Sequence, residues 1–329
     1  MSKNKVYSLS LSARATLDMH SLNNEGGEGN QIQTRMVDIV AGDGKLHNVN
    51  AISGDMFKHI QAEHLYQIAR NSGTEDGHSL PLCAACQVFD ANRISADADF
   101  MTQIADMSDA QAIDMMLKAC TLDDIEGNLL TGEGRSTPRK SVVEFGWIVG
   151  VPELTRTDAY FHVKYARDRG IAEEADEGAR QANLEQRIFH RPASSGVYAV
   201  VSHYEVARIG YNDIAQHYAL DEDERTARYR ALLESVLYTF VQPKGAMRAA
   251  QMPHIVAFEG VLSHTTDVLP APTISALNAD YDQEIEGIAD ALNGLRPGAV
   301  VVRRFSSLAG FANAMRNLVE TTAPFSLAV

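Results

Sequence analysis

Three cysteines and one histidine give the sequence its clearest metal-ligand spacing. His78, Cys83 and Cys86 follow the pattern H-x4-C-x2-C, and Cys120 could supply a fourth ligand for tetrahedral zinc. A second C-x2-C pair is missing, and cysteines that pack as small buried apolar residues are the favoured interpretation. We therefore expect no cofactor, with zinc at these four residues as the alternative.

Asp18 and His20 are the residues best placed for hydrolytic chemistry. Both lie just beyond the first predicted strand, where a carboxylate on an exposed loop can act as a base or a metal ligand. Such chemistry needs further groups at the same place, and the sequence contains no H-E-x-x-H, G-x-S-x-G, Walker or dinucleotide-binding motif. Polar loop residues near a turn are the favoured interpretation, so we do not expect an enzyme.

The segment NAISGDMFKH places anion-binding features at the start of a predicted helix. Ser53 is the expected N-cap, and Gly73 is the expected end of the helix. Backbone amides at a helix N-terminus bind anions, and Lys58 adds positive charge one turn later. Any capped helix with a lysine shares these features, so they do not define a nucleic-acid site by themselves.

Charge is unevenly distributed along the chain. Asp and Glu number 43 against 29 Lys and Arg, which gives a formal net charge of −14. An acidic chain repels phosphate at long range, so composition gives no sign of nucleic-acid binding. Acid is concentrated in segments such as 97–126 and 280–287, whereas most basic clusters lie elsewhere. This segregation allows a local basic track on an acidic body, and solvated faces explain each cluster equally well.

Length and composition indicate the class of protein. A chain of 329 residues with 45% hydrophobic content can bury a substantial core. Three cysteines are too few for a disulfide framework. No apolar run approaches the roughly 20 residues that span a bilayer, and the first residues contain no apolar signal segment. We expect a cytoplasmic protein with no membrane partner.

The order of predicted elements indicates the fold class. Residues 6–15 alternate apolar and polar side chains, which predicts a strand with one covered face. After insertions are set aside, the expected order is strand 6–15, helix from Ser53, strand 142–151, strand 195–206, helix 221–240 and strand 254–263. This is the split βαβ order of ferredoxin-like and RRM-type folds, so the fold class is α+β.

Four stretches carry a resemblance to a known family. They are SLSARATLDMHSLNNEGGEGNQIQTRMV, VNAISGDMFKHIQAEHL, RPASSGVYAVVSHYEVARIG and QPKGAMRAAQMP. Their order and spacing resemble those of the CRISPR-associated Cascade backbone subunit, the DevR-like branch of family seven, which is of the RAMP type. The resemblance extends from near residue 5 to about residue 255 and is weakest over 72–140 and 153–187.

The resemblance implies a single domain, 1–329, with a modified RRM or ferredoxin-like palm. Insertions are expected to form a helical finger at 72–140 and an extended thumb at 153–193. Similar proteins polymerise head to tail along a CRISPR RNA and hold its backbone, which leaves the bases free to pair with target DNA in antiviral defence. The implied partners are the guide RNA, other copies of the chain, and the large, guide-end capping and guide-processing endonuclease subunits of a type I Cascade.

The resemblance also implies an RNA-binding set, carried over position by position. The implied residues are Asn23, Asn24, Gln31, Arg35, Ser53, Gly54, Lys58, His59, Gln186, Arg187, His190, Arg191, Lys244, Gly245 and Arg248. Some relatives carry a second basic residue on the helix where Gln61 or Ala62 stands here, which puts phosphate contact at that position in doubt. Phosphate-gripping side chains suit a protein that must hold any guide sequence. The polar face of the helix at Ser53 is therefore interpreted as a phosphate clamp.

Two alternatives from other classes remain open. Related RNA-targeting complexes contain RNA-cleaving backbone subunits with a catalytic aspartate after the first strand, and Asp18 lies near that place. The other alternative is a regulatory or structural oligomer that binds no RNA. Loss of target-RNA cleavage on substitution of Asp18 would indicate the first, and tight protein-only oligomerisation would indicate the second.

Overall fold

The structure is a computed structural model, and it describes residues 4–23, 26–28, 31–72, 80–132, 134–164 and 187–328. The helices are α1 (Gly54–Asn71), α2 (Ala84–Gln87), α3 (Ala98–Ile104), α4 (Asp109–Ala119), α5 (Thr121–Glu126), α7 (Glu222–Val241), α8 (Tyr281–Leu295) and α9 (Leu308–Thr321), with 3-10 turns η2 (Arg93–Ala96) and η3 (Val206–Arg208). None of the described helices combines the length and hydropathy needed to cross a bilayer.

The strands fall into one large sheet and several short pairs. The large sheet contains β2 (Ser8–His20), β3 (Gly27–Glu28), β4 (Gln31–Ile32), β5 (Met36–Val40), β6 (Leu46–Ile52), β9 (Val143–Phe145), β10 (Ile148–Lys164), β11 (Arg187–Tyr204), β14 (His254–Thr265) and β15 (Val300–Phe305). The short pairs join β1 (Asn4–Val6) to β16 (Thr322–Pro324), β12 (Tyr211–Asn212) to β13 (His217–Tyr218), and β7 (Asn128–Gly132) to β8 (Arg135–Arg139).

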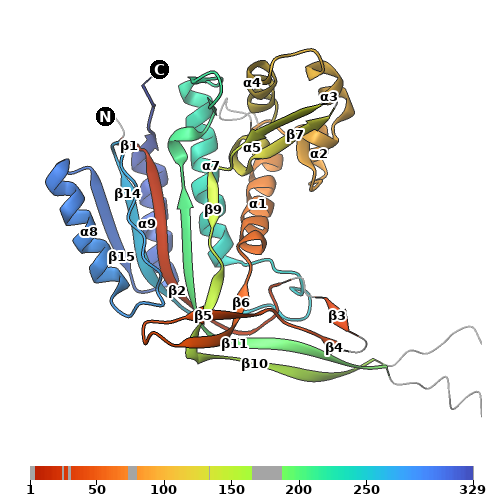
Figure 1. Ribbon diagram of the computed structural model, residues 1–329, viewed down its shortest axis with the longest axis vertical. Coiled ribbons are helices and arrows are strands. Elements are labelled where there is room, and N and C mark those ends of the chain that lie inside the picture. Colours follow the sequence, from red (N-terminus) through yellow and green to blue (C-terminus); the bar gives the residue numbers. More distant parts are fainter. Residues whose placement is uncertain are drawn as a thin grey trace, which may run out of the picture.

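The centre of the large sheet has ferredoxin-like topology. Strand β2 lies between β14 and β11, and β11 pairs on its other side with β9 and β10, all antiparallel. In chain order this is strand β2, helix α1, strands β9 and β10, strand β11, helix α7 and strand β14. The split βαβ order predicted from the sequence is therefore confirmed, and α8, β15 and α9 extend it at one edge (Figure 1).

Helices cover both faces of this sheet. On one face α1, α7 and α9 share the main core, to which neighbouring strands contribute Leu11 and Leu262. On the other face Ala199 and Val261 pack with Tyr281 and Ile285 of α8. Alternate residues of a strand point to opposite faces, so each central strand supplies both cores.

The polar face of β2 is buried, contrary to the expectation of one covered face. Ser8, Ser10 and Ser12 are each 1% exposed. Their hydroxyls hydrogen-bond to the segment 269–273: Ser10 donates to the carbonyl of Ala271 at 3.0 Å, and Ser12 pairs with the Thr273 hydroxyl at 2.8 Å. Small serines allow this segment to lie flat on the sheet while its backbone groups stay hydrogen-bonded. The sheet face that ordinary RRM domains use for base stacking is thus closed.

The segment 80–139 forms the group of short helices and the β7–β8 hairpin at the upper right of Figure 1, beside α1. Helices α3 and α4 follow one another within this segment. Ser108 caps α4 in a capping box with Gln111, and Asp97 caps α3. Apolar residues of this segment, such as Ile113 and Met116, are continuous with the main core.

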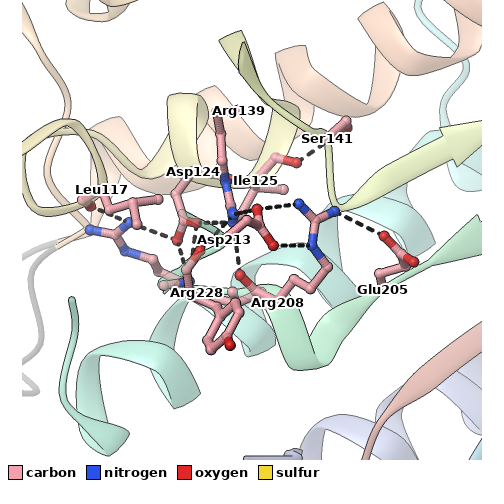
Figure 2. Close-up of polar contacts among 12 residues, drawn as sticks. Leu117, Asp124, Ile125, Arg139, Ser141, Glu205, Arg208, Asp213 and Arg228 are labelled. Atoms are coloured by element: carbon pink, nitrogen blue, oxygen red, sulfur yellow. Dashed lines mark hydrogen bonds and ion pairs between the residues drawn. The ribbon is translucent and has the colours of Figure 1, made fainter. Parts of the chain in front are cut away.

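A buried ion network joins this segment to the palm (Figure 2). Asp124 of α5 accepts hydrogen bonds from Arg139 of β8 at 2.8 Å and from Arg228 of α7 at 2.9 Å. These three side chains are at most 1% exposed. Asp213 extends the network by pairing with Arg139 and with Arg208. A buried carboxylate that compensates two buried cations fixes how α5 lies against α7.

Strands β10 and β11 continue past the palm as a long antiparallel hairpin, in one register from Thr155 opposite Gly196 to Lys164 opposite Arg187. Register shifts interrupt both strands where the hairpin leaves the palm sheet, near Glu153 and Gly196. A side chain at Gly196 would collide with the main chain of Leu154. Bulges of this kind bend strands, and Figure 1 shows the hairpin extending sideways from the lower end of the palm.

Candidate nucleic-acid interface

Three distant segments meet at the start of α1. Asn23, at the end of the first strand, donates from Nδ2 to the carbonyl of Ala51 at 2.7 Å. Its Oδ1 accepts from the backbone amide of Ser53 at 3.0 Å. The Asn23 side chain is 5% exposed, so it positions the β6–α1 junction from inside the protein.

The late loop, residues 243–252, packs against the same junction. The amide of Ala246 donates to the carbonyl of Leu22 at 3.0 Å, and Gln251 donates to the carbonyl of Pro192 at 2.9 Å. A Cβ atom at Gly245 would lie 2.6 Å from the Cα of Leu22, so this position requires glycine. The structure therefore brings together the segment after β2, the start of α1, the late loop and β11. The resemblance implies that these same elements contact RNA.

The first turn of α1 is built as predicted. The Ser53 hydroxyl accepts from the amide of Met56 at 3.2 Å, which confirms Ser53 as the N-cap. Gly54 lies so close to the carbonyl of Phe145 that a side chain there would collide with it. Ser53 is 9% exposed and its hydroxyl is used by the cap, so the structure assigns it a local role. The helix ends at Asn71 with Ser72 as its C-cap, directly before the predicted stop at Gly73, which lies outside the described residues.

Lys58 lies half-buried between α1 and α5. Its ammonium group donates to the carbonyl of Glu126 at 3.0 Å. Burial lowers the pKa of Lys58, and burial likewise raises the pKa of the Glu126 carboxyl group, which is 2% exposed. Lys58 also lines a cavity of about 300 Å³ with His59, Phe89 and Arg93. This hollow on the polar side of α1 is large enough for a phosphate group, and its lining includes two acidic side chains, Asp55 and Asp90, beside the cations Lys58 and Arg93.

Glu63 neutralises the basic residues of the late loop. Lys244 approaches its carboxylate at 3.5 Å and Arg248 at 3.0 Å. Burial raises the pKa of Glu63, but the hydrogen bond from Arg248 and the charge of Lys244 outweigh it, so the pKa is lowered overall. These pairs dock the late loop on α1, one turn beyond His59. The exposed fraction of the Arg248 side chain is 54%, which leaves it open to a second anion.

Of the remaining predicted residues, those that the structure describes lie on β4, on β11 and, for Arg35, just before β5. The Arg35 guanidinium lies 5.5 Å from the ring centre of Trp147, and the His190 ring packs edge-on against Phe161 at 5.9 Å. His190 lies opposite Gln31 in the β11–β4 pairing, and Arg191 is half-buried beside it. For Arg187 and Gln31 the structure describes the backbone alone. Asn24, Gln186 and the zinc candidate His78 lie outside the described residues.

Asp18 and His20 are not on an exposed loop. Both belong to β2, which pairing with β14 and β11 extends to residue 20, and Asp18 faces His254 across the β2–β14 pair. His20 is 2% exposed, and burial lowers its pKa to about 4. Within the described part of the chain, the acid and base side chains grouped closely enough to hold a metal do not include Asp18. The predicted loop setting for hydrolysis is therefore wrong.

Sequence reasoning missed several residues that shape this surface. Arg93 and Phe89 come from the segment 80–96, and Glu63 comes from α1 itself. A partial signal existed for Glu63, because it lies four residues after His59 on the same helix face. Arg93 had no local signal, since its place beside Lys58 depends on how the short helices fold back on α1.

Comparison with solved structures finds similarity to chains of CRISPR-associated proteins. A chain of a structure described as "CRISPR RNA-guided surveillance complex, pre-nicking" matches with a TM-score of 0.51 and 13% identity, over 94% of this chain and 99% of that chain. A chain of a "CRISPR RNA-guided surveillance complex" gives 0.46 and 13%, over 95% and 98%. Csc2 of Thermofilum pendens gives 0.41 and 12%, over 95% and 85%.

Sequence comparison assigns the family. A search of curated proteins finds no match. The sequence profile of the family described as "CRISPR-associated negative auto-regulator DevR/Csa2" matches residues 11–286, which is well over half of the chain. Together with the shared fold, this confirms the resemblance found in the strand, loop and helix motifs. The protein belongs to the CRISPR-associated DevR/Csa2 family.

Proposed function

We propose that this protein is the backbone subunit of a type I CRISPR surveillance complex that holds the guide RNA by its phosphates and catalyses no reaction. The observation that carries the proposal is the convergence of Asn23, the α1 N-terminus and the late loop on one surface. Asn23 and the late loop lie more than 200 residues apart in sequence, yet hydrogen bonds join the Leu22–Asn23 segment both to the late loop and to the start of α1. Their cations, Lys58, Lys244 and Arg248, all lie against α1.

Because one face of the palm sheet is covered, RNA binding through phosphate contacts is favoured over binding through base stacking. Ser8, Ser10 and Ser12 lie under the segment 269–273, so bases cannot stack on that part of the palm. A guide must expose its bases to pair with target DNA, and a protein that grips phosphate and sugar serves every sequence equally. The acidic character of the whole chain is compatible with this role. Only the RNA groove, meaning the surface formed by the start of α1 and the loop 243–252, needs to be basic.

We propose head-to-tail polymerisation along the guide RNA. A head-to-tail contact is heterologous, so repeated copies form an open filament that capping subunits must end. The β5–β6 hairpin exposes Val40 and Leu46, whose side chains are 64% and 68% exposed. Apolar residues at the tip of a hairpin suit contact with a neighbouring copy. Target DNA, the large subunit, the guide-end capping subunit and the guide-processing endonuclease are the further partners in this proposal.

Equilibrium binding to single-stranded RNAs of unrelated sequence tests the proposal. We expect similar affinities for all sequences and a steep fall with salt, since phosphate contacts release counterions. Arg316→Ala on α9 is the control, because this exposed arginine pairs with Glu320, away from the proposed groove. A strong preference for one sequence, or binding that does not respond to salt, would contradict the proposed phosphate grip.

The absence of catalysis is tested separately through Asp18. We expect the complex assembled with Asp18→Ala to bind target nucleic acid as the unaltered complex does, with no cleavage by either. If the unaltered complex cleaves target RNA and the variant does not, the RNA-cleaving alternative is correct.

A further inference from the structure

Four buried ligand atoms gather in the segment 80–139, next to the cavity lined by Lys58, Arg93 and Leu122. Cys83 and Cys86 lie at the start of α2, Cys120 lies between α4 and α5, and Asp123 lies on α5. Their sulfur and carboxylate oxygen atoms all lie within 4.8 Å of one another. Cys86, Cys120 and Asp123 are 0% exposed and Cys83 is 8% exposed.

The distances between these atoms fit one tetrahedral ion. With Zn–S bonds of 2.3 Å and Zn–O bonds near 2.1 Å, tetrahedral angles place sulfur atoms about 3.8 Å apart and a sulfur about 3.6 Å from an oxygen. The Asp123 Oδ2 atom lies 3.7 Å from the Cys83 sulfur and 3.4 Å from the Cys86 sulfur. A [4Fe–4S] cluster would need the sulfurs farther apart, because each thiolate would bind a different iron.

Asp123 is oriented so that one oxygen faces the sulfurs. Its other oxygen, Oδ1, accepts hydrogen bonds from the Asn128 side-chain amide at 2.6 Å and from the Ile94 backbone amide at 3.4 Å. Metal-binding carboxylates are held in this way by partners outside the ligand set. Asp123 has no ion-pair partner within the described residues, and Arg93 is the positive side chain that acts on it electrostatically. A bound metal would supply the direct counter-charge that a buried carboxylate needs.

The Cys83–Cys86 turn is shaped to hold two thiolates. The Cys83 sulfur is the N-cap acceptor of α2 and receives the backbone amide of Cys86 at 3.4 Å. A helix of four residues is not stable on its own, and its position here depends on tertiary contacts. Four protein ligands leave no open position, which is the arrangement of structural zinc sites.

We propose that Cys83, Cys86, Cys120 and Asp123 bind a structural Zn²⁺ that fastens α2 to the α4–α5 junction. Asp123 stands in this ligand set where the set considered from the sequence has His78. The next residue, Asp124, anchors α5 to Arg139 and Arg228, so the metal and the ion network hold opposite sides of one short helix. The alternative arrangement is metal-free, with the Cys83 and Cys86 thiols donating to the carboxylate.

The metal content of the full chain tests the proposal. The protein is expressed with zinc, passed through gel filtration with a mild chelator, and measured by plasma mass spectrometry. The expected result is one zinc per chain; zinc in only a small fraction of chains would overturn the proposal.

Replacement of zinc by Co²⁺ identifies the ligands. The chain contains three cysteines, and all three belong to this site, so an absorption band from thiolate-to-cobalt charge transfer must come from it. Metal retention without that band also overturns the proposal.

Variants separate the site from general stability. Asp123→Asn keeps the shape of the side chain but removes its charge, and Asn128→Ala removes the group that orients Asp123. We expect each to weaken zinc affinity at least about tenfold. Asp106→Asn, at an exposed acid between α3 and α4, is the matched control and should leave affinity unchanged. Equal affinity in Asp123→Asn and the control would overturn the assignment of Asp123, and the result is independent of RNA binding.

Discussion

The ammonium group of Lys58 on α1 donates a hydrogen bond to the carbonyl of Glu126 at the end of α5, at 3.0 Å. The polar face of α1 therefore has two roles. It supports the short helices of the segment 80–139, and it offers positive charge to the cavity that Arg93 also lines. A lysine has three donor hydrogens, so the bond to Glu126 leaves two for an anion.

Lys58→Ala should weaken binding to single-stranded RNA by a similar factor for all sequences. Removal of one phosphate contact should reduce the slope of log affinity against log salt by about 0.7. Lys58→Arg should retain most of the affinity, because the charge is kept. The measurement is a salt series with several RNAs, with Arg316→Ala as the control. A loss confined to some sequences, or an unchanged slope, would argue that Lys58 serves only its bond to Glu126.

Gly245→Ala should disturb the late loop and, with it, RNA binding. The added methyl group would meet the main chain of Leu22 at 2.6 Å, so the loop must move away from the α1 junction. We expect a loss of about 1–3 kcal/mol in the free energy of unfolding together with weaker RNA binding. Gly42→Ala is the matched control, since a Cβ at that loop glycine meets nothing within 4 Å. Equal behaviour of the two variants would show that loop docking is not needed.

The order of elements could be predicted from the sequence because each signal is local. Alternation marked the first strand, β-branched runs marked the central strands, and Ser53 marked the start of α1. The cover on Ser8, Ser10 and Ser12 could not be predicted, since the covering segment lies some 260 residues away and has no pattern of its own. The length of β2 was missed for the same reason: pairing with β14 and β11 extends it beyond the alternating stretch.

The sequence predicted which segments form the candidate site, but not what each side chain does there. The resemblance grouped Asn23, Ser53 and Gly245, and the structure places them together. Their burial could not be read from the sequence, because it arises from contacts among the three segments. In the same way, the acid beside Lys244 and Arg248 comes from α1, and only the folded chain brings it there.

Asp124→Ala should destabilise the protein by about 3–5 kcal/mol, because it leaves the buried guanidinium group of Arg228 without a counter-charge and that of Arg139 with Asp213 alone. Asp213→Ala, in the same network but 44% exposed, should cost about 1 kcal/mol or less. Urea unfolding of both variants gives the comparison. A loss for Asp124→Ala no larger than that for Asp213→Ala would show that the buried pairs do not secure α5 to α7.

His20 should make the protein less stable in acid. Burial lowers its folded-state pKa to about 4, whereas the unfolded chain takes up the proton near 6.5, the ordinary value. Between these values the unfolded state binds more protons, so stability falls as the pH drops from 6.5 toward 4. His20→Phe keeps the ring contact with Tyr198 and should make this decline shallower. His264, whose pKa burial also lowers to about 4, should account for part of the remaining slope.

Unfolding by urea at pH 7 and pH 5 measures this effect. The unaltered protein should lose more stability between the two values than His20→Phe does. The same loss in both proteins would mean that the His20 ring is protonated in the folded state at pH 5, contrary to its buried setting.

The RNA that travels with the protein tests the central claim most directly. The protein is purified from cells that express it with a CRISPR array and the neighbouring genes, and the bound RNA is extracted and sequenced. Our account predicts processed repeat–spacer RNA, spread evenly over the spacers, because phosphates and not bases are held. Protein free of RNA, or RNA drawn from a single spacer, would contradict it.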